Sequence, residues 1–469
     1  MLTNFKFKKY LAPFFYIIVF VLFLPIINSP IHGDDLVAPF NYYFKFNGSI
    51  FDYISSISFA FDGHINFLGE IVSALWLDLS ISLLVNFDSM DFYVYGYRIT
   101  KLFVVLIFLF IAAKMNHRIS QKLSTNSLLL YTLLSFLVVT VYHTNWSSDP
   151  VGNYPLTGYA SASMAGLYIL LLRRKTFNNK LGYHFLFITL AILYYELNIA
   201  LLAVMIYHFR RKINGAKSIL IILVTIIFST YLYIFLTPPN AYDGGKISFN
   251  LLLFRSFVLQ LVSPFPPTTF PLAVYFSQAA IASSLIFLCA LLILIINMRV
   301  FSKTYEHLSG RSNHYLKFLS INENEKMLLI YFVCSCFILS ASKKYQAEII
   351  YPGQVYMSFS SGQLLFIVLM TRILITHSFS SSARKIFLVT LLAISISFQN
   401  YLMVSKLHER TQYTQALLYA WEKKESERCL ALENFNTYRL GELYMKEFKK
   451  SLSKVYYDKK KFPFCDREL

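Results

Sequence analysis

The chain has 469 residues, of which 56% are hydrophobic and only 14% are charged. Soluble domains are about half apolar and a quarter charged, so this composition excludes an ordinary cytosolic enzyme. The net charge is +18, but Lys and Arg stand between apolar blocks and form no patch large enough for nucleic acid. The apolar blocks, of roughly 15 to 22 residues, have the length of helices that cross a bilayer. The sequence therefore predicts an all-α polytopic membrane protein embedded in a lipid bilayer, with no nucleic-acid partner.

A basic segment precedes the first apolar run. Lys6, Lys8 and Lys9 stand before residues 10–27, which resemble a signal peptide in charge and length. No small-residue cleavage site follows, so we expect an uncleaved first span whose N-terminus lies in the cytoplasm. Residues 1–402 are predicted to form one transmembrane domain of about eleven helices. The later apolar blocks are 99–113, 127–142, 158–172, 181–194, 198–208, 217–236, 274–297, 327–342, 356–376 and 384–402.

The basic residues between these blocks set the orientation. When the eleven predicted spans alternate across the membrane, 22 Lys and Arg residues fall on the side of the N-terminus and 7 on the other side. Cytoplasmic loops carry the excess of Lys and Arg in membrane proteins. This distribution predicts a multi-pass protein of the bacterial inner membrane, with a cytoplasmic N-terminus and a periplasmic C-terminus.

Two long outer segments contain apolar stretches of their own. Within residues 29–98, the stretch 67–85 carries several carboxylates, among them Glu70. Carboxylates at bilayer depth are costly, so we expect a helix on the membrane surface with an acidic face. Within residues 237–273, prolines bracket the apolar stretch 247–262. We expect this stretch to form a second interfacial or re-entrant helix.

Residues 181–207 are too long for one span and short for two. Basic clusters flank the segment, and Tyr194, Tyr195, Glu196 and Asn198 interrupt its middle. We expect a tight helical hairpin that turns at Glu196 on the outer side, with helices that cross only part of the bilayer or meet a thinned bilayer. The alternative is one tilted helix with a buried Glu196, which would remove one span and invert the topology downstream.

Residues 403–469 follow the last predicted span and are polar. We expect them to form a small soluble helical domain on the periplasmic side. Cys429 and Cys465 both fall in this tail and form a disulfide only if the tail lies in an oxidising compartment; two free thiols are the alternative. Cys334 and Cys336 lie within an apolar block, so we expect inert core residues.

Two adjacent carboxylates stand just beyond the outer end of the first span. Asp34 and Asp35 follow Gly33, a few residues after the apolar run ends. Carboxylates next to hydrocarbon are costly to desolvate, which favours a functional role. One role is a general base that takes a proton from an acceptor hydroxyl. A divalent-cation ligand and a solvated turn are the alternatives.

In layout, the chain resembles the C-type superfamily of polytopic glycosyltransferases (GT-C). The shared features are a short cytoplasmic N-terminus, one span, the Asp34–Asp35 pair at the start of a long outer loop, about ten further spans and a soluble tail. Within this superfamily, it looks like the bacterial serotype-converting, phage-type glucosyltransferases that add side-branch glucose to O-antigen. The resemblance implies a polyprenyl-phosphate-linked sugar donor, a catalytic carboxylate at Asp34 or Asp35, and a glycan acceptor on the outer face.

Cations at headgroup depth on the outer side are candidates for binding the donor phosphate. A sugar that leaves a lipid phosphate regenerates an anion, so a transferase needs positive charge there. Lys343 and Lys344 interrupt the positive-inside trend at this depth, and Arg255 lies in the apolar middle of the second outer segment. Tyr351 follows the two lysines and is a candidate for lining a sugar site. The alternative is that the two lysines snorkel to the interface within an aromatic belt.

Other polar and aromatic residues are candidates for contacting the sugar or the acceptor. Glu196 and Tyr195 lie at the predicted hairpin tip, and either hydrogen-bond sugar hydroxyls or cap the turn. His64 and Glu70 belong to the first outer loop and are candidates for acceptor contacts. Trp146 lies in another outer loop and offers a stacking platform for a sugar or an interfacial anchor.

No metal-ligand spacing, Gly-rich phosphate loop or dinucleotide fingerprint accompanies these residues. We therefore expect an enzyme that requires no cofactor, with a divalent cation as the alternative role for the carboxylates. A polysaccharide polymerase is a second hypothesis, although its class is expected to have Arg-rich outer loops, whereas the first loop here is acidic. A lipid or solute transporter is a third, although most carboxylates fall in loops rather than within spans.

Overall fold

The computed structural model describes about two fifths of the chain. The first predicted span, the spans at 274–297 and 384–402, and the tail 403–469 lie outside the described residues. The described residues are 50–56, 67–87, 90–117, 128–129, 131–133, 135–136, 155–178, 180–210, 225–226, 229, 246–262, 264, 322–348 and 358–376.

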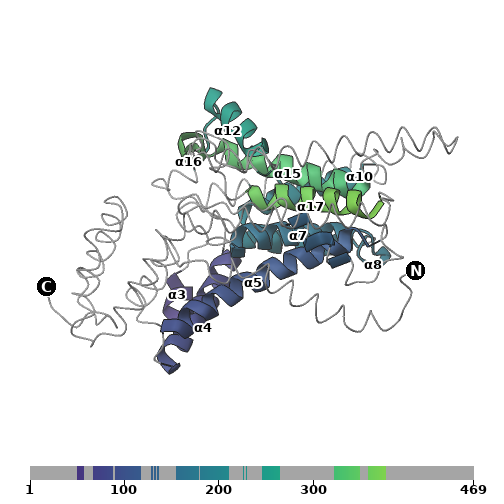
Figure 1. Ribbon diagram of the computed structural model, residues 1–469. Coiled ribbons are helices and arrows are strands. Elements are labelled where there is room, and N and C mark those ends of the chain that lie inside the picture. Colours follow the sequence, from purple (N-terminus) through teal and green to yellow (C-terminus); the bar gives the residue numbers. More distant parts are fainter. Residues whose placement is uncertain are drawn as a thin grey trace, which may run out of the picture.

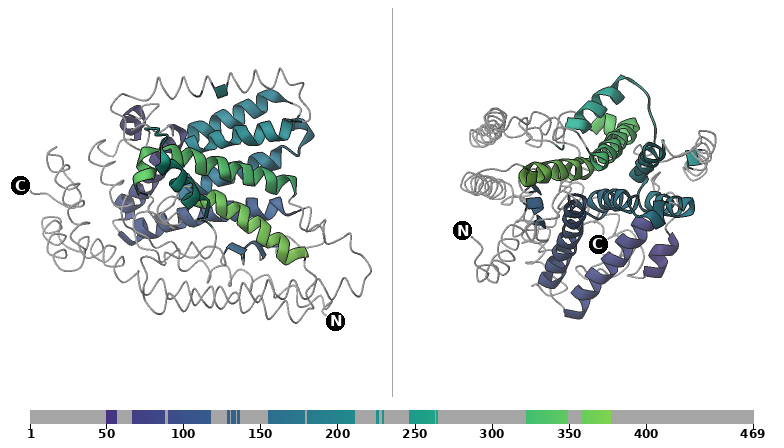
Figure 2. Two further views of the ribbon diagram at one scale, coloured as in Figure 1. Left: turned by 90° about the horizontal axis from the view of Figure 1, so that it is seen from above. Right: turned by 90° about the vertical axis from the view of Figure 1, so that its right-hand side faces the viewer.

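The described elements are helices, which confirms the all-α prediction for this part of the chain. Helices α7, α15 and α17 pack against one another, and α5 packs on α7 and α17 (Figure 1). Seen from above, most of the longer teal and green helices lie side by side with roughly aligned axes (Figure 2). The elements are α3 (Ile50–Ser56), α4 (Phe67–Phe87), α5 (Met90–Met115), the π-helix η2 (Pro155–Tyr159), α7 (Ala160–Leu171), α8 (Lys175–Asn178), α9 (Leu181–Tyr194), the 3₁₀ helix η3 (Glu196–Ile199), α10 (Ala200–Phe209), α12 (Leu251–Val262), α15 (Glu323–Ala341), α16 (Lys343–Glu348) and α17 (Phe359–Thr376).

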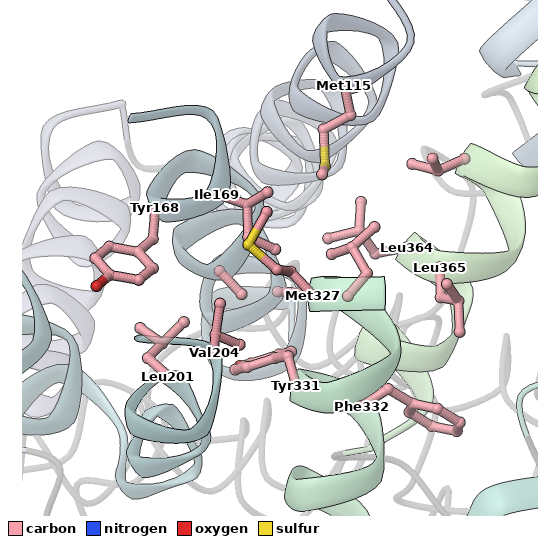
Figure 3. Packing of buried hydrophobic residues seen from close by; sticks show 14 of the residues in the cluster. Met115, Tyr168, Ile169, Leu201, Val204, Met327, Tyr331, Phe332, Leu364 and Leu365 are labelled. Carbon is pink, nitrogen blue, oxygen red and sulfur yellow. The ribbon is translucent and has the colours of Figure 1, made fainter. Parts of the chain in front are cut away.

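The main apolar core lies between α5, α7, α10, α15 and α17. Tyr331 of α15 is buried beside Val204 and Leu201 of α10, and Leu364 of α17 faces the same interior (Figure 3). Glycine allows α17 to come close to its neighbours, because a Cβ atom at Gly362 would lie 2.5 Å from Pro264 and 2.8 Å from the Phe332 ring. Small residues at helix contacts are typical of helices packed in membranes.

Helix α15 begins four residues before the predicted span at 327–342, because a capping box supports its first turn. The side chain of Asn322 accepts hydrogen bonds from the backbone N–H groups of Asn324 and Glu325, and the Glu325 carboxylate accepts one from the Asn322 N–H at 2.8 Å. These bonds satisfy backbone donors that the first helical turn leaves without partners. A prediction from hydrophobicity alone does not locate the start of α15, because its first turn is polar.

Residues 181–209 form a helical hairpin, as predicted. Helix α9 ends at Tyr194, the extended residue Tyr195 breaks it, and η3 leads into α10. His184 near the start of α9 contacts Phe209 at the end of α10, with ring centroids 5.0 Å apart. The two helices therefore run antiparallel, and the alternative of one continuous tilted helix is wrong.

The outer segments are helical, but two of their boundaries differ from prediction. The predicted helix at 67–85 is confirmed as α4. Helix α5 begins at Met90, nine residues before the predicted span at 99–113. The reason is that a helix continues through polar and Tyr-rich sequence once it packs against a neighbour, and α4 packs on α5 here.

The helix of the second outer segment starts four residues after the beginning of its apolar stretch. The predicted helix at 247–262 begins at Leu251, since the Asn250 side chain accepts hydrogen bonds from the N–H groups of Leu252 and Leu253. Residues 246–249 precede it in non-helical conformation, and Ile247 forms an isolated antiparallel bridge with Ser342. This bridge joins the second outer segment to the end of α15.

Within the described ranges, α15 is the one helix that is both long and apolar enough to span a membrane, and the other apolar helices are shorter. The predicted number of about eleven transmembrane helices is not confirmed by this part of the chain. Helices α5 and α9 nevertheless carry large apolar side chains on their outer faces as well as inside. The exposed ones include Phe103, Leu106, Ile107 and Phe110 on α5, and Phe185, Leu186 and Leu190 on α9.

Candidate functional site

The two ends of the helix bundle differ in chemistry. At one end, called the basic end, the last residues of α7 and α10 meet the start of α15. Arg173 donates a hydrogen bond to the Asn324 side chain at 3.0 Å, and the guanidinium of Arg210 lies 3.8 Å from the carboxylate of Glu323. This end carries the cations that the charge distribution predicted to share one side with the N-terminus.

A buried ion pair completes the basic end. Arg372 of α17 lies 2.9 Å from the Glu325 carboxylate, and the side chains are 12% and 0% exposed. The end of α5 joins the same region, because the Asn116 amide donates to the Val368 carbonyl of α17 at 3.1 Å. Since α5, α7, α10 and α17 all finish here and α15 starts here, the described helices alternate in direction as the topology predicted.

The opposite end, called the outer end, brings together most of the described candidate site residues. It contains α12 and α16, which pack together on the end of α15 (Figure 1). Lys343 and Lys344 open α16, and Arg255 lies on α12. Glu196 lies at the hairpin turn between α9 and α10. The outer end therefore carries both cations and a carboxylate.

A backbone clasp holds the cations of the outer end in place. Residues 246–248 and 341–343 exchange backbone hydrogen bonds: Ser248 N–H donates to the Ala341 carbonyl at 2.8 Å, and Lys343 N–H donates to the Lys246 carbonyl at 2.9 Å. These bonds bring the backbone of Lys246 next to that of Lys343. Lys246 and Lys343 are both exposed.

The side chain of Gln346 reinforces this clasp from inside. Its amide donates to the Ser248 carbonyl at 2.6 Å and to the Ser340 carbonyl at 2.9 Å, and the side chain is buried. Arg255 adds a link from α12, because its Nη2 donates to the Gln346 carbonyl at 3.0 Å. A guanidinium has five N–H donors, so this bond leaves others available for an anion.

A tyrosine cluster underlies the hairpin turn and connects it to α16. Tyr194, Tyr195 and Tyr345 are buried together with Leu339, and Leu68 of α4 packs against the cluster. The ammonium of Lys344 lies 5.9 Å from the centre of the Tyr345 ring. Tyr195 is only 4% exposed, so its ring supports the turn from within. The cluster fixes the hairpin tip relative to the lysines and to the start of α4, where Glu70 lies.

A second polar contact holds the hairpin turn from the side of the core. The Asn198 amide donates to the Ala191 carbonyl at 2.8 Å, and the Tyr331 hydroxyl donates to the Asn198 side-chain oxygen at 3.0 Å. Both side chains are buried. Since Asn198 lies two residues after Glu196, these bonds restrict where the Glu196 carboxylate can lie.

Five predicted site residues lie outside the described part of the chain. They are Asp34, Asp35, His64, Trp146 and Tyr351. The structure therefore does not describe Asp34 and Asp35, the two carboxylates that the GT-C resemblance singles out. In the portion that the structure describes, no three His, Cys, Asp or Glu side chains lie close enough to hold a metal ion. Cys334 and Cys336 are free cysteines in α15; Cys336 lies in the core as predicted, whereas Cys334 is half-buried.

The sequence interpretation missed three residues of the outer end. Lys246 stands alone in a loop, so nothing in the sequence shows that it joins Lys343. Gln346 and Asn198 are polar residues within or beside apolar helices, and such residues need partners when buried. Asn198 marked the predicted hairpin turn, but its role in holding that turn was not predicted, and Gln346 was not considered.

Comparison with protein-family models, with curated proteins and with solved structures finds no match to this chain.

Proposed function

We propose that the chain is a multi-pass membrane glycosyltransferase. It moves a sugar, for which glucose is our proposal, from a polyprenyl-phosphate donor to a surface glycan such as O-antigen. The observation that carries this proposal is the grouping of four cations at the end that also holds Glu196. The four are Lys246, Arg255, Lys343 and Lys344. An outer-face transferase needs positive charge for the lipid phosphate at the place where the sugar hydroxyls are held.

The distribution of side chains supports the membrane part of the proposal. Helices α5 and α9 expose Phe, Leu and Ile on the outside, while serines, threonines and amides of the same bundle are buried and hydrogen-bonded. A helix that is apolar all round belongs in a large protein core or in a membrane. We propose about eleven spans, a cytoplasmic N-terminus at the bacterial inner membrane and a periplasmic tail at 403–469.

The chemistry of transfer assigns a role to each group. A carboxylate, Asp34 or Asp35, takes the proton of the acceptor hydroxyl as its oxygen bonds to the anomeric carbon. The bond from that carbon to the phosphate oxygen breaks, and the lipid phosphate leaves with the electron pair. Lys343, Lys344, Arg255 and Lys246 stabilise the phosphate. Glu196 hydrogen-bonds the sugar hydroxyls, with Glu70, His64, Trp146 and Tyr351 on the acceptor side. No cofactor takes part.

The proposal is tested by mass spectrometry of the surface glycan from cells with and without the protein. We expect one added hexose per repeating unit. Asp34→Asn, Asp35→Asn and the double variant Lys343→Gln/Lys344→Gln should abolish or strongly reduce the addition, while Lys326→Gln at the basic end should not. Membrane insertion of each variant is checked by immunoblot.

Two outcomes would contradict the proposal. A change in polymer length without an added hexose would identify a polymerase. An unchanged glycan, with donor present, would remove the transferase assignment and leave a transporter. If Asp34→Asn and Asp35→Asn both add hexose at the wild-type level, neither aspartate is the general base.

A further inference from the structure

The connection between α7 and α9 forms a compact basic corner at the basic end of the bundle. We define the basic corner as residues 173–178 and 180–183. Successive turns close it: Arg174 N–H donates to the Leu171 carbonyl at 2.9 Å, Phe177 N–H to the Arg174 carbonyl at 3.1 Å, and Lys180 N–H to the Phe177 carbonyl at 3.1 Å. The short helix α8 lies within it, at the end of the bundle away from α12 and α16 (Figure 1).

An aromatic anchor fixes this corner to the bundle. The Phe177 ring lies 4.6 Å from the ring centre of His184 and 6.1 Å from that of Tyr168, and both of these side chains are fully buried. The Tyr168 hydroxyl and His184 Nδ1 are 3.1 Å apart, which joins α7 to α9. The cations on either side of Phe177 therefore extend from a fixed backbone.

The basic corner carries a cluster of exposed cations. Arg174, Lys175 and Lys180 are all exposed, and residues 173–183 contain neither Asp nor Glu. Two carboxylates that the structure describes at this end, Glu323 and Glu325, face other cations. Glu323 accepts a hydrogen bond from Lys326 at 3.0 Å, and Glu325 pairs with Arg372.

An exposed apolar stripe continues directly from these cations along α9. Lys180 hydrogen-bonds the Tyr183 hydroxyl at 3.3 Å, and its ammonium lies 5.0 Å from the centre of that ring. Leu186 and Leu190 follow on the same helical face and are 56% and 46% exposed. At Gly182 an added Cβ atom would meet nothing within 4 Å, so the start of the stripe is open.

We propose that the basic corner binds an anionic phospholipid. The headgroup phosphate contacts Arg174, Lys175 and Lys180, and an acyl chain lies along Tyr183, Leu186 and Leu190. Charge complementarity at one end and an apolar face continuous with it match the two parts of a lipid, whereas a soluble anion would use the cations alone. The inference depends on the proposed membrane location but not on the transferase reaction.

The test uses the full-length purified protein in nanodiscs of phosphatidylcholine containing 20% phosphatidylglycerol as the probe lipid, released for native mass spectrometry. We expect wild-type protein to retain phosphatidylglycerol above its share of the bilayer. Each of Arg174→Gln, Lys175→Gln and Lys180→Gln should weaken retention roughly fivefold, and the triple variant on the order of 100-fold. Leu186→Asn should also reduce retention.

Matched controls separate a defined site from general positive charge. Lys326→Gln removes one cation from the same end, and Leu106→Asn makes the same apolar change on the outer face of α5. Neither should alter retention by more than twofold. Equal retention by the triple variant and the wild type would overturn the proposal, and so would equal loss in Lys326→Gln.

A competition experiment with a soluble anion tests whether the site binds a lipid or a free anion. Inorganic phosphate at 10-fold excess over the lipid should not displace phosphatidylglycerol. Displacement would show a site for free anions and overturn the assignment to a lipid. Because this assay contains no sugar donor, its failure is distinct from a failure of the glycan measurement.

Discussion

Glu325 combines two functions in one side chain at the start of α15. One carboxylate oxygen accepts the hydrogen bond from Asn322 N–H that completes the capping box, and the same oxygen faces the guanidinium of Arg372 at 2.9 Å. Desolvating a charged pair costs as much as its mutual attraction returns, so such a pair stabilises little in total. Removing one partner, by contrast, leaves the other charge buried. The two functions can be separated, because glutamine can cap but cannot carry a charge.

The first residue-scale prediction uses this separation. Glu325→Gln should lower the free energy of unfolding by about 3–5 kcal/mol, because it keeps the cap and leaves Arg372 without its counter-charge. The double variant Glu325→Gln/Arg372→Met should lose less than the sum of the two single changes. Both are measured by denaturant unfolding in detergent micelles.

A matched control isolates the cap. Asn322→Ala keeps the ion pair and removes the side-chain acceptor, so it should cost about 1 kcal/mol. Strictly additive losses in the double variant would contradict a coupling between Glu325 and Arg372.

At the scale of single helices, α17 owes its position to a glycine. Gly362 faces Pro264 and the Phe332 ring at distances that no larger residue permits without displacement. Gly166 of α7 faces Ile111 of α5 in the same way, with 2.5 Å between the added Cβ and the Ile111 side chain. Gly182, at the start of α9, faces open space. The surroundings of the three glycines therefore differ, and the residue type alone does not reveal this difference.

The element-scale prediction compares two of these glycines. Gly362→Ala should destabilise the protein by about 1–3 kcal/mol, because the new methyl group pushes α17 away from α15. Gly182→Ala should leave stability unchanged or raise it by up to about 1 kcal/mol, since alanine favours the helix. Thermal unfolding of both variants in the same detergent compares them, and equal midpoints would contradict the packing described for α17.

At the scale of the molecule, the charged groups discussed here for the described helices lie at two ends of the bundle. The basic end holds ion pairs and the basic corner, while the outer end holds the clasp, the tyrosine cluster and the Glu196 turn. Between them lies a core whose buried polar groups pair with one another across helices, such as Tyr159 with Gln363 and Thr371 with Ser135. If the bundle spans a membrane, the two ends face different compartments.

The whole-molecule prediction tests this with cysteine labelling. In a variant whose five cysteines are replaced, Lys343→Cys should react with a membrane-impermeant maleimide from the periplasmic side of intact inner membranes. Arg174→Cys should react only after the membrane is permeabilised. Labelling is measured by gel shift, and labelling of both positions from the same side would contradict the two-ended topology.

Much of the described fold was predictable because hydrophobic runs and basic flanks act locally. The helix at 181–194 was located to the residue, and the hairpin at Glu196 followed from length and flanking charge. Helix starts at Glu323 and Met90 were misplaced, because capping and packing extend helices into polar sequence. Local hydrophobicity carries no information about helix capping or about packing between helices.

The site was predictable in its residue types but not in its assembly. Lys343, Lys344 and Arg255 stood out because cations are unexpected at that depth. Lys246 did not, since its proximity to Lys343 depends on backbone hydrogen bonds between distant segments. Tyr195 looked like a sugar contact, yet it is buried because the turn needs apolar support from beneath. Long-range pairing of this kind has no signature in a single sequence.

The clasp at the outer end also constrains the order of biosynthesis. Ser248 and Gln346 hydrogen-bond across 98 positions of the chain. At about 5–20 residues per second, the ribosome needs roughly 5–20 s to make the intervening segment. Through that interval α12 has no partner in α15 or α16, so the cations it contributes remain separate while the earlier helix pairs already lie together. The clasp is therefore a feature that the nascent protein acquires late, only after α16 has left the ribosome.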